Sequence, residues 1–190
     1  MNRIISMTLL GISVAFGANI QTLTQQCEAN NAKACVDLGV AYYNGTGVAR
    51  NDAKVFEFIK KSCDLGYADG CNELGSCYEL GIGVGKNLSK AFEFYKKACD
   101  MGDAGGCFNV GVLYKRGKGV AKDLSKGFEF YKKSCDMGSA DGCSNVGDAY
   151  YKGEGVKKDI NAAKNYSKKA CGMGSKTACE NYKIILKERR

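Results

Sequence analysis

The chain has 190 residues, of which 45% are hydrophobic and 25% are charged, and this balance excludes an intrinsically disordered protein. Histidine is absent, so the commonest general base of enzymes and the commonest metal ligand are both missing. The formal net charge of +8 comes largely from lysine pairs such as Lys96 and Lys97, which recur along the chain among glutamates and predict a solvated face, not a nucleic-acid interface.

The N-terminus is typical of an export signal. Arg3 leads into an apolar stretch from Ile4 to Phe16, and small residues follow it. This stretch is shorter than the about 20 residues that a membrane-spanning helix needs, which argues against an uncleaved anchor. We therefore expect residues 1–18 to be removed, and the mature chain to be secreted or periplasmic with no membrane segment left. Cysteines can oxidise there.

The eleven cysteines obey one spacing rule. Ten of them form pairs whose members are eight residues apart, successive pairs are 36 residues apart, and only Cys77 is left over. Pairing each of these cysteines with the one eight residues away leaves the same bridge in every unit, which predicts disulfides. Zinc binding is the alternative, but histidine is missing and the spacing is longer than zinc sites use, so we expect no metal and no cofactor. The expected bridges are Cys27–Cys35, Cys63–Cys71, Cys99–Cys107, Cys135–Cys143 and Cys171–Cys179.

A shift of 36 residues superimposes the sequence on itself, which is the signature of a solenoid. In the second unit, Cys71, Leu74, Gly75 and Tyr78 share one helical face and predict a first helix, called helix A. Helix A is expected to stop at Gly81, in a Gly-x-Gly-Val turn that every unit contains.

The second helix of each unit, called helix B, is expected to start at a capping residue and to end near a glycine such as Gly102. Cys99 would then end one helix B and Cys107 would start the next helix A, so that each bridge clamps two adjacent units. Closing such a loop stabilises the fold by about 2.6 kcal/mol on the chain-entropy model. The four predicted capping residues are Asn51, Asn87, Asp123 and Asp159.

These elements predict an all-α protein, an α/α-solenoid of disulfide-bridged helix-turn-helix repeats. We expect an N-terminal capping helix over residues 19–34, four 36-residue repeats over 35–178, and a C-terminal capping helix over 179–190. The end helices need polar outer faces, because internal repeats are apolar on both stacked faces.

The motif Leu74-Gly75-x-x-Tyr78-x-x-Gly81-x-Gly83-Val84, followed by a helix B that runs from Lys90 to Ala98, resembles the Sel-one-like repeat, a relative of the tetratricopeptide repeat. With cysteines at both helix junctions, the chain is similar to the Helicobacter cysteine-rich proteins. The resemblance covers essentially the whole mature chain. It implies an exported right-handed superhelix that binds protein or peptide ligands, and some members of the cysteine-rich subgroup are described as slow β-lactamases or penicillin-binding proteins.

Signatures of catalysis are missing from the sequence. The serine β-lactamase motifs S-x-x-K, S-D-N and K-T-G are absent, and catalytic residues are left unassigned. Cys77 is the one candidate nucleophile, but its equivalents at the 36-residue shift are Ala41, Leu113 and Ala149. We therefore predict that Cys77 is buried and behaves as a small hydrophobic residue. The tyrosines at positions 42, 78, 114 and 150 are predicted to pack between helices.

Ligand contacts are expected on helix A, which usually lines the concave side of a solenoid. Positions that vary between repeats are free to contact a ligand, and side-chain amides suit an extended peptide backbone because they both donate and accept. We expect a monomer that binds a peptide or protein; a peptidoglycan-derived peptide or a β-lactam, with hydrolysis, is the alternative that the resemblance implies. The expected contact residues are Asn109, Asn145, Lys115, Arg116, Tyr151 and Lys152.

Overall fold

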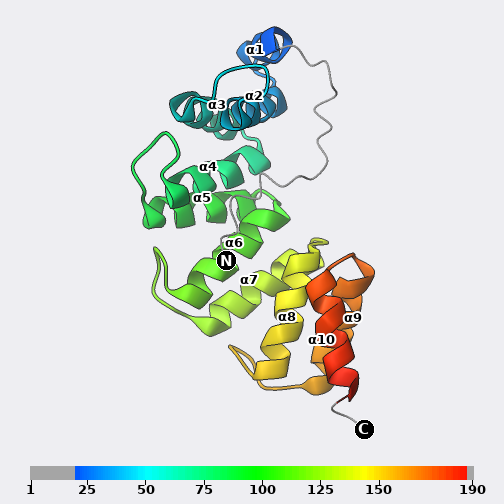
Figure 1. Cartoon of the computed structure of the whole chain (residues 1–190). Coiled ribbons are helices and arrows are strands. Elements are labelled where there is room, and N and C mark those ends of the chain that lie inside the picture. Colours follow the sequence, from blue (N-terminus) through cyan, green and yellow to red (C-terminus); the bar gives the residue numbers. More distant parts are fainter. Residues whose placement is uncertain (1–19, 188–190) are drawn as a thin grey trace. The chain divides into compact units, whose positions relative to one another are not determined.

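A computed structural model describes residues 20–187, which form ten α-helices and contain no strand (Figure 1). The predicted export signal, residues 1–18, lies outside the described residues. The all-α solenoid of disulfide-bridged helix pairs is confirmed. No helix within residues 20–187 combines the length and the apolar character that crossing a membrane requires. The helices are α1 (Ile20–Glu28), α2 (Ala32–Asn44), α3 (Asp52–Asp64), α4 (Ala68–Leu80), α5 (Leu88–Asp100), α6 (Ala104–Arg116), α7 (Leu124–Asp136), α8 (Ala140–Lys152), α9 (Ile160–Gly172) and α10 (Lys176–Lys187).

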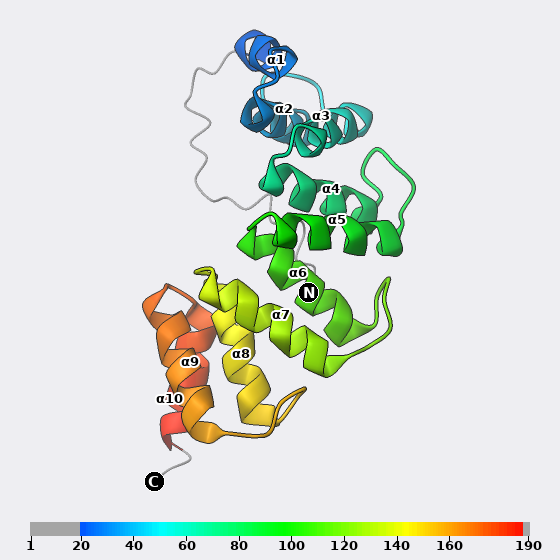
Figure 2. The ribbon, with the colours of Figure 1, turned by 180° about the vertical axis from the view of Figure 1, so that it is seen from behind.

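The chain divides into two compact units, the first ending at Ala98 and the second beginning at Cys99. In the first unit α2 packs against α3, and α3 packs against α4. In the second unit each helix from α6 to α10 packs against the next, and α8 also contacts α6 and α10 (Figure 2). Even-numbered helices from α2 to α10 are the A helices, and odd-numbered helices from α3 to α9 are the B helices.

Capping residues fix the helix ends as the sequence predicts. The side chain of Asn51 accepts a 3.1 Å hydrogen bond from the backbone N–H of Lys54, and the residues at the equivalent positions 87, 123 and 159 do the same. Gly81 ends α4 in the left-handed conformation, with φ at 79°, and its N–H donates to the carbonyl of Cys77. The turn that follows also needs its second glycine, since a Cβ on Gly83 would collide with the carbonyl oxygen of Asp52, and in the fourth repeat a Cβ on Gly155 would collide with that of Leu124.

The predicted starts of the A helices are wrong by about one turn. Cys107 is the fourth residue of α6, which begins at Ala104, and Cys99 is followed by one more residue of α5. The first turn of α6 contains Gly105 and Gly106, so it lacks the apolar periodicity from which the helix was predicted. Asp103 caps the helix by accepting from the N–H of Gly106.

All five predicted disulfides are present, with Cα–Cα distances between 4.4 and 4.7 Å. Each joins the last turn of one helix to the first turn of the next A helix. Four of the five bridges are buried, and the fifth, Cys171–Cys179, is partly exposed. The four buried bridges therefore hold successive helices together inside the apolar core.

Aromatic rings fill the space within each helix pair. Tyr78 of α4 stacks on Phe94 of α5 with ring centroids 5.5 Å apart. Tyr42, Tyr114 and Tyr150 each stack in the same way on an aromatic ring of the B helix that follows them. The predicted packing role of these tyrosines is confirmed.

Candidate functional site

The six predicted contact residues lie on two neighbouring A helices of the second unit. α6 carries Asn109, Lys115 and Arg116, and α8 carries Asn145, Tyr151 and Lys152. Their role in binding a ligand stays a prediction.

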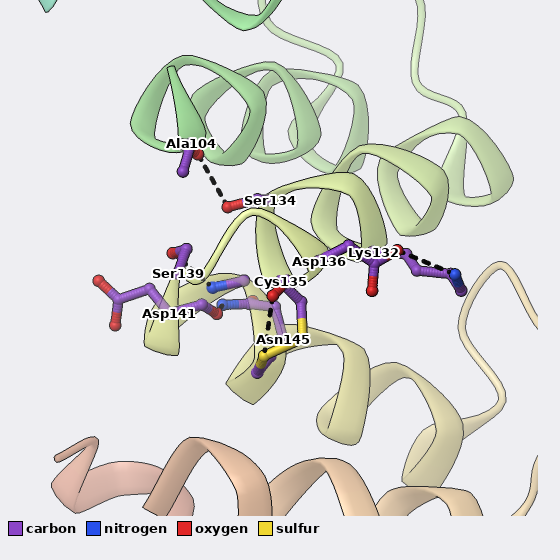
Figure 3. Close-up of a disulfide and its surroundings, with 10 residues drawn as sticks. Ala104, Lys132, Ser134, Cys135, Asp136, Ser139, Asp141 and Asn145 are labelled. Carbon is purple, nitrogen blue, oxygen red and sulfur yellow. Dashed lines mark hydrogen bonds and ion pairs between the residues drawn. A yellow bond between two sulfur atoms is a disulfide. The ribbon is translucent and has the colours of Figure 1, made fainter. Parts of the chain in front are cut away.

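The two asparagines occupy the same register position on α6 and α8, and both are partly buried. The Nδ2 of Asn145 donates a 2.9 Å hydrogen bond to the backbone carbonyl of Asp141, one turn earlier (Figure 3). An amide nitrogen carries two N–H groups and this bond uses one of them.

Asn181 on α10 is the third member of this series, and the sequence analysis missed it. It lies 36 residues after Asn145, just as Asn145 lies 36 residues after Asn109. The repeat period carries this signal, but the sequence predicts only a capping role for the helix over residues 179–190. Because α8 contacts both α6 and α10, the structure brings the three helices that carry this series together.

A pocket of about 190 Å³ opens where α8, α9 and α10 meet. Tyr151 and Lys152 line it; the other four predicted residues do not. Ile184, which is 50% exposed, gives the pocket an apolar side that solvent reaches. The full lining is Gly147, Asp148, Tyr151, Lys152, Ser167, Asn181, Ile184 and Ile185.

The pocket exists because a large side chain is missing from the fourth repeat. In the second repeat, Tyr95 of α5 lies over Gly75 of α4, so closely that a Cβ on Gly75 would be 2.6 Å from the ring. Tyr131 lies over Gly111 in the same way in the third repeat. The equivalent residue in the fourth repeat is Ser167, which lies over Gly147. A serine fills much less space than a tyrosine and leaves the neighbouring volume open.

The charged groups around the pocket balance one another. Asp148 lies 2.8 Å from Lys152 and 3.8 Å from Lys115, and Lys115 also lies 2.8 Å from Glu154. The hydrogen bond with Asp148 raises the pKa of Lys152, and the hydrogen bond from Lys115 lowers the pKa of Glu154. Two cations facing two carboxylates carry no net charge. The surroundings therefore favour a neutral polar group over a free anion.

Cys77, the candidate nucleophile, is buried in α4 as predicted. Burial raises the pKa of its thiol to about 12, and the carboxylates of Glu73 and Asp52 add to this effect. A thiol with such a pKa supplies almost no thiolate at neutral pH and is a poor nucleophile. Among residues 20–187, no three cysteine, aspartate or glutamate side chains are grouped in a way that suits a metal ion.

The paired lysines of the B helices are mostly exposed. Lys132 forms a 3.1 Å ion pair with Asp136 one turn later on α7 (Figure 3), and Lys60 pairs with Asp64 on α3 in the same way. Such pairs add little stability and suit a solvated face.

Comparison with protein families finds four consecutive matches to the Sel1 repeat, at residues 32–67, 68–103, 104–139 and 140–175. This is the Sel-one-like repeat that the sequence motifs resemble. Comparison with curated proteins finds no match.

Several solved structures share the fold. The protective antigen c5321 of uropathogenic Escherichia coli, which has an SLR fold, is 29% identical, with a TM-score of 0.81 over 86% of this chain and 35% of its own length. A Sel1 repeat protein from Oxalobacter formigenes is 27% identical, with a TM-score of 0.80 over 84% of this chain and 65% of its own. The present chain thus spans about a third of the length of the Escherichia coli protein and about two thirds of the length of the Oxalobacter formigenes protein.

The similarity extends to a cysteine-rich relative. Helicobacter pylori cysteine rich protein B is 35% identical, with a TM-score of 0.54 over 65% of this chain and 89% of its own length. The predicted resemblance to the Helicobacter cysteine-rich proteins is confirmed by this match.

Proposed function

The chain belongs to the Sel1 repeat family, and we propose that it is an exported scaffold whose α6, α8 and α10 bind an extended segment of a peptide or protein. Sel1 repeat proteins mediate protein interactions. The observation that carries the proposal here is the series Asn109, Asn145 and Asn181, which puts one side-chain amide at the same register position on three neighbouring helices.

The spacing of this series suits a peptide backbone. Packed helices lie about 8–10 Å apart, and an extended chain advances about 3.3 Å per residue. Successive asparagines would therefore meet backbone groups about three residues apart on the ligand. An amide that both donates and accepts can satisfy the N–H and the C=O of such a strand, whatever side chains the ligand carries.

Export follows from the predicted signal over residues 1–18 and fits the disulfides, since bridges of this kind persist in oxidising compartments. A secreted or periplasmic protein is therefore proposed. We further propose that α1 and α10 close the two ends of the repeat array. α10 does more than cap, because its Ile184 is half exposed beside the pocket.

The β-lactamase activity that the resemblance implies stays a prediction without support from the described contacts. Its one nucleophile candidate, Cys77, is buried with a raised pKa. Binding, not hydrolysis, is the function that the arrangement of α6, α8 and α10 favours.

Selection of peptides from a random displayed library on the immobilised, oxidised protein tests the proposal. We expect the enriched peptides to bind the wild-type chain, and a triple Asn109→Ala, Asn145→Ala, Asn181→Ala variant to bind them at least about tenfold more weakly, which corresponds to about 1.4 kcal/mol. Asn165→Ala is the matched control, because Asn165 is an exposed asparagine on α9. Equal affinity of the triple variant, with its melting temperature unchanged, contradicts the proposal.

A further inference from the structure

Tyr95 of the second repeat shows what kind of group the pocket beside Ser167 accepts. In the second repeat, the ring of Tyr95 lies over Gly75, and its hydroxyl group donates a 2.9 Å hydrogen bond to Glu79 and lies 3.1 Å from the hydroxyl of Ser76. Tyr95 is 2% exposed. The space between helix A and helix B in this repeat is thus filled by a phenol group, whose hydrogen-bond partners on helix A are the residue next to Gly75 and the residue one turn further along.

The fourth repeat keeps the glycine of helix A and polar side chains at the partner positions, but it lacks the ring. Ser167 stands in place of the tyrosine, Asp148 in place of Ser76, and Tyr151 in place of Glu79, and all three residues line the pocket. The carboxylate of Asp148 is an acceptor at the position where the hydroxyl of Tyr95 finds a partner in the second repeat. We infer that this pocket binds the side chain of a tyrosine from the peptide or protein ligand, with the ring against Ile184 and Ile185 and the hydroxyl group donating to Asp148.

The size of the pocket agrees with one ring. An apolar cavity of about 150 Å³ holds benzene, whereas sites for drug-sized ligands are about 300–1,000 Å³. The present volume of about 190 Å³ therefore matches a single phenol group, and the open side of the pocket leaves room for the rest of a ligand.

The charges select the neutral phenol over its phosphorylated form. Lys115 and Lys152 are already matched by Asp148 and Glu154, so a phosphate would meet two carboxylates as well as two cations. The ion pair with Lys152 leaves Asp148 able to accept another hydrogen bond, because a carboxylate has about four acceptor positions.

This inference rests on the proposed function only for the source of the ring, a peptide or protein. The pocket itself is tested with p-cresol, the side-chain analogue of tyrosine. Titration of the oxidised, isotope-labelled protein should shift the amide signals of Gly147, Ser167 and Asn181, with a dissociation constant on the order of 1 mM for so small a fragment. No shift up to the solubility limit of p-cresol, or shifts confined to other residues, would overturn the inference.

Two substitutions at one position provide the matched comparison. Ser167→Tyr gives the fourth repeat the side chain of the second and third, fills the pocket from within, and should weaken p-cresol binding at least about tenfold. Ser167→Ala leaves the pocket open and should keep the wild-type affinity. Equal affinity in all three proteins overturns the inference. If Ser167→Tyr does not fold, Ser167→Leu fills the same space and is expected to give the same loss.

A third variant tests the hydrogen bond to Asp148. Asp148→Asn should reduce the affinity for p-cresol severalfold and leave the affinity for 4-methylanisole, which cannot donate, unchanged. An equal effect on both compounds overturns the assignment of Asp148.

Peptides separate the failure of this inference from the failure of the proposed function. A selected peptide that binds equally well after its tyrosines are replaced by alanine overturns the tyrosine pocket and leaves the peptide-binding scaffold intact. Binding of p-cresol by a protein that selects no peptide retains the pocket and rejects the proposed function.

Discussion

The hydroxyl group of Ser134, near the end of α7, donates a 2.8 Å hydrogen bond to the backbone carbonyl of Ala104, the first residue of α6 (Figure 3). Ser134 is buried, and it also contacts the start of α8, where a Cβ on Gly142 would lie 2.7 Å from its oxygen. One small side chain thus joins three helices beside the Cys135–Cys143 bridge. Ser62 makes the same bond to Ala32 in the first repeat.

Removing this hydroxyl should cost more than removing an exposed one. Ser134→Ala is expected to lower the free energy of unfolding by about 1–2 kcal/mol, since the partner carbonyl of Ala104 loses a buried donor. Urea unfolding of the oxidised protein measures the change. Ser125→Ala, at an exposed position of α7, is the control and should change the stability by less than about 0.5 kcal/mol. Equal stability of the two variants would show that the hydrogen bond contributes nothing.

Reduction of the disulfides should unfold or greatly loosen the chain. Each bridge closes a short loop and thereby stabilises the folded state by about 2.6 kcal/mol on the chain-entropy model. Five such bridges together are comparable with the whole free energy of unfolding of a typical domain, about 5–15 kcal/mol. Circular dichroism and the melting temperature, recorded with and without a reductant, measure the effect. An unchanged melting temperature in reductant would mean that noncovalent packing alone holds the helices together.

The thiol of Cys77 should be inert in the folded protein. Because burial raises its pKa to about 12, a thiol reagent at pH 8 is expected to label no cysteine in the native chain and one after unfolding without reduction. Rapid labelling of the native protein would contradict the burial of this residue.

Cys77 should also make stability depend on alkaline pH. Its folded pKa lies above the unfolded value of 9.0, so its contribution is complete below pH 9 and decreases as the pH rises from 9 towards about 12, where the unfolded thiol ionises first. The stability of the wild type should therefore fall more steeply over this range than that of Cys77→Ala, in which alanine matches the residues at the equivalent positions 41 and 149. Parallel pH profiles from thermal unfolding would contradict this linkage.

Two glycines with similar backbone angles should respond very differently to alanine. Gly155 has a φ of 73°, and its Cβ would collide with the carbonyl of Leu124, so Gly155→Ala should cost about 2–4 kcal/mol. Gly138 has a φ of 91° with nothing within 4 Å of a Cβ, so Gly138→Ala should cost only the backbone strain of about 1–2 kcal/mol. Denaturant unfolding compares them, and equal losses would show that strain and not contact dominates at Gly155.

Sequence reasoning predicted the features that repeat and missed those that depend on departures from the repeat. The caps at Asn51 and Gly81 and the five bridges followed from a period of 36 residues, because the same local chemistry occurs in each unit. The start of α6 was misplaced, because its first turn is rich in glycine and has no apolar pattern.

The pocket was missed for a different reason. The substitution of serine for tyrosine at position 167 is visible at the 36-residue shift, but the open volume also depends on where α10 puts Ile184 and Ile185. The ion pair between Lys115 and Glu154 was unpredictable too, since it joins a helix of one repeat to the turn of the next. Such contacts depend on three-dimensional packing and leave no periodic signal.

The short span of each disulfide has a consequence for biogenesis. Because the two cysteines of a bridge are only eight residues apart, a bridge such as Cys27–Cys35 can close while the C-terminal half of the chain is still being synthesised or translocated. Every correct partner is the nearest cysteine in the sequence, apart from the competitor Cys77 close to Cys71. In an oxidising compartment, maturation can therefore proceed repeat by repeat from the N-terminus, with little need for an isomerase to reshuffle mispaired thiols.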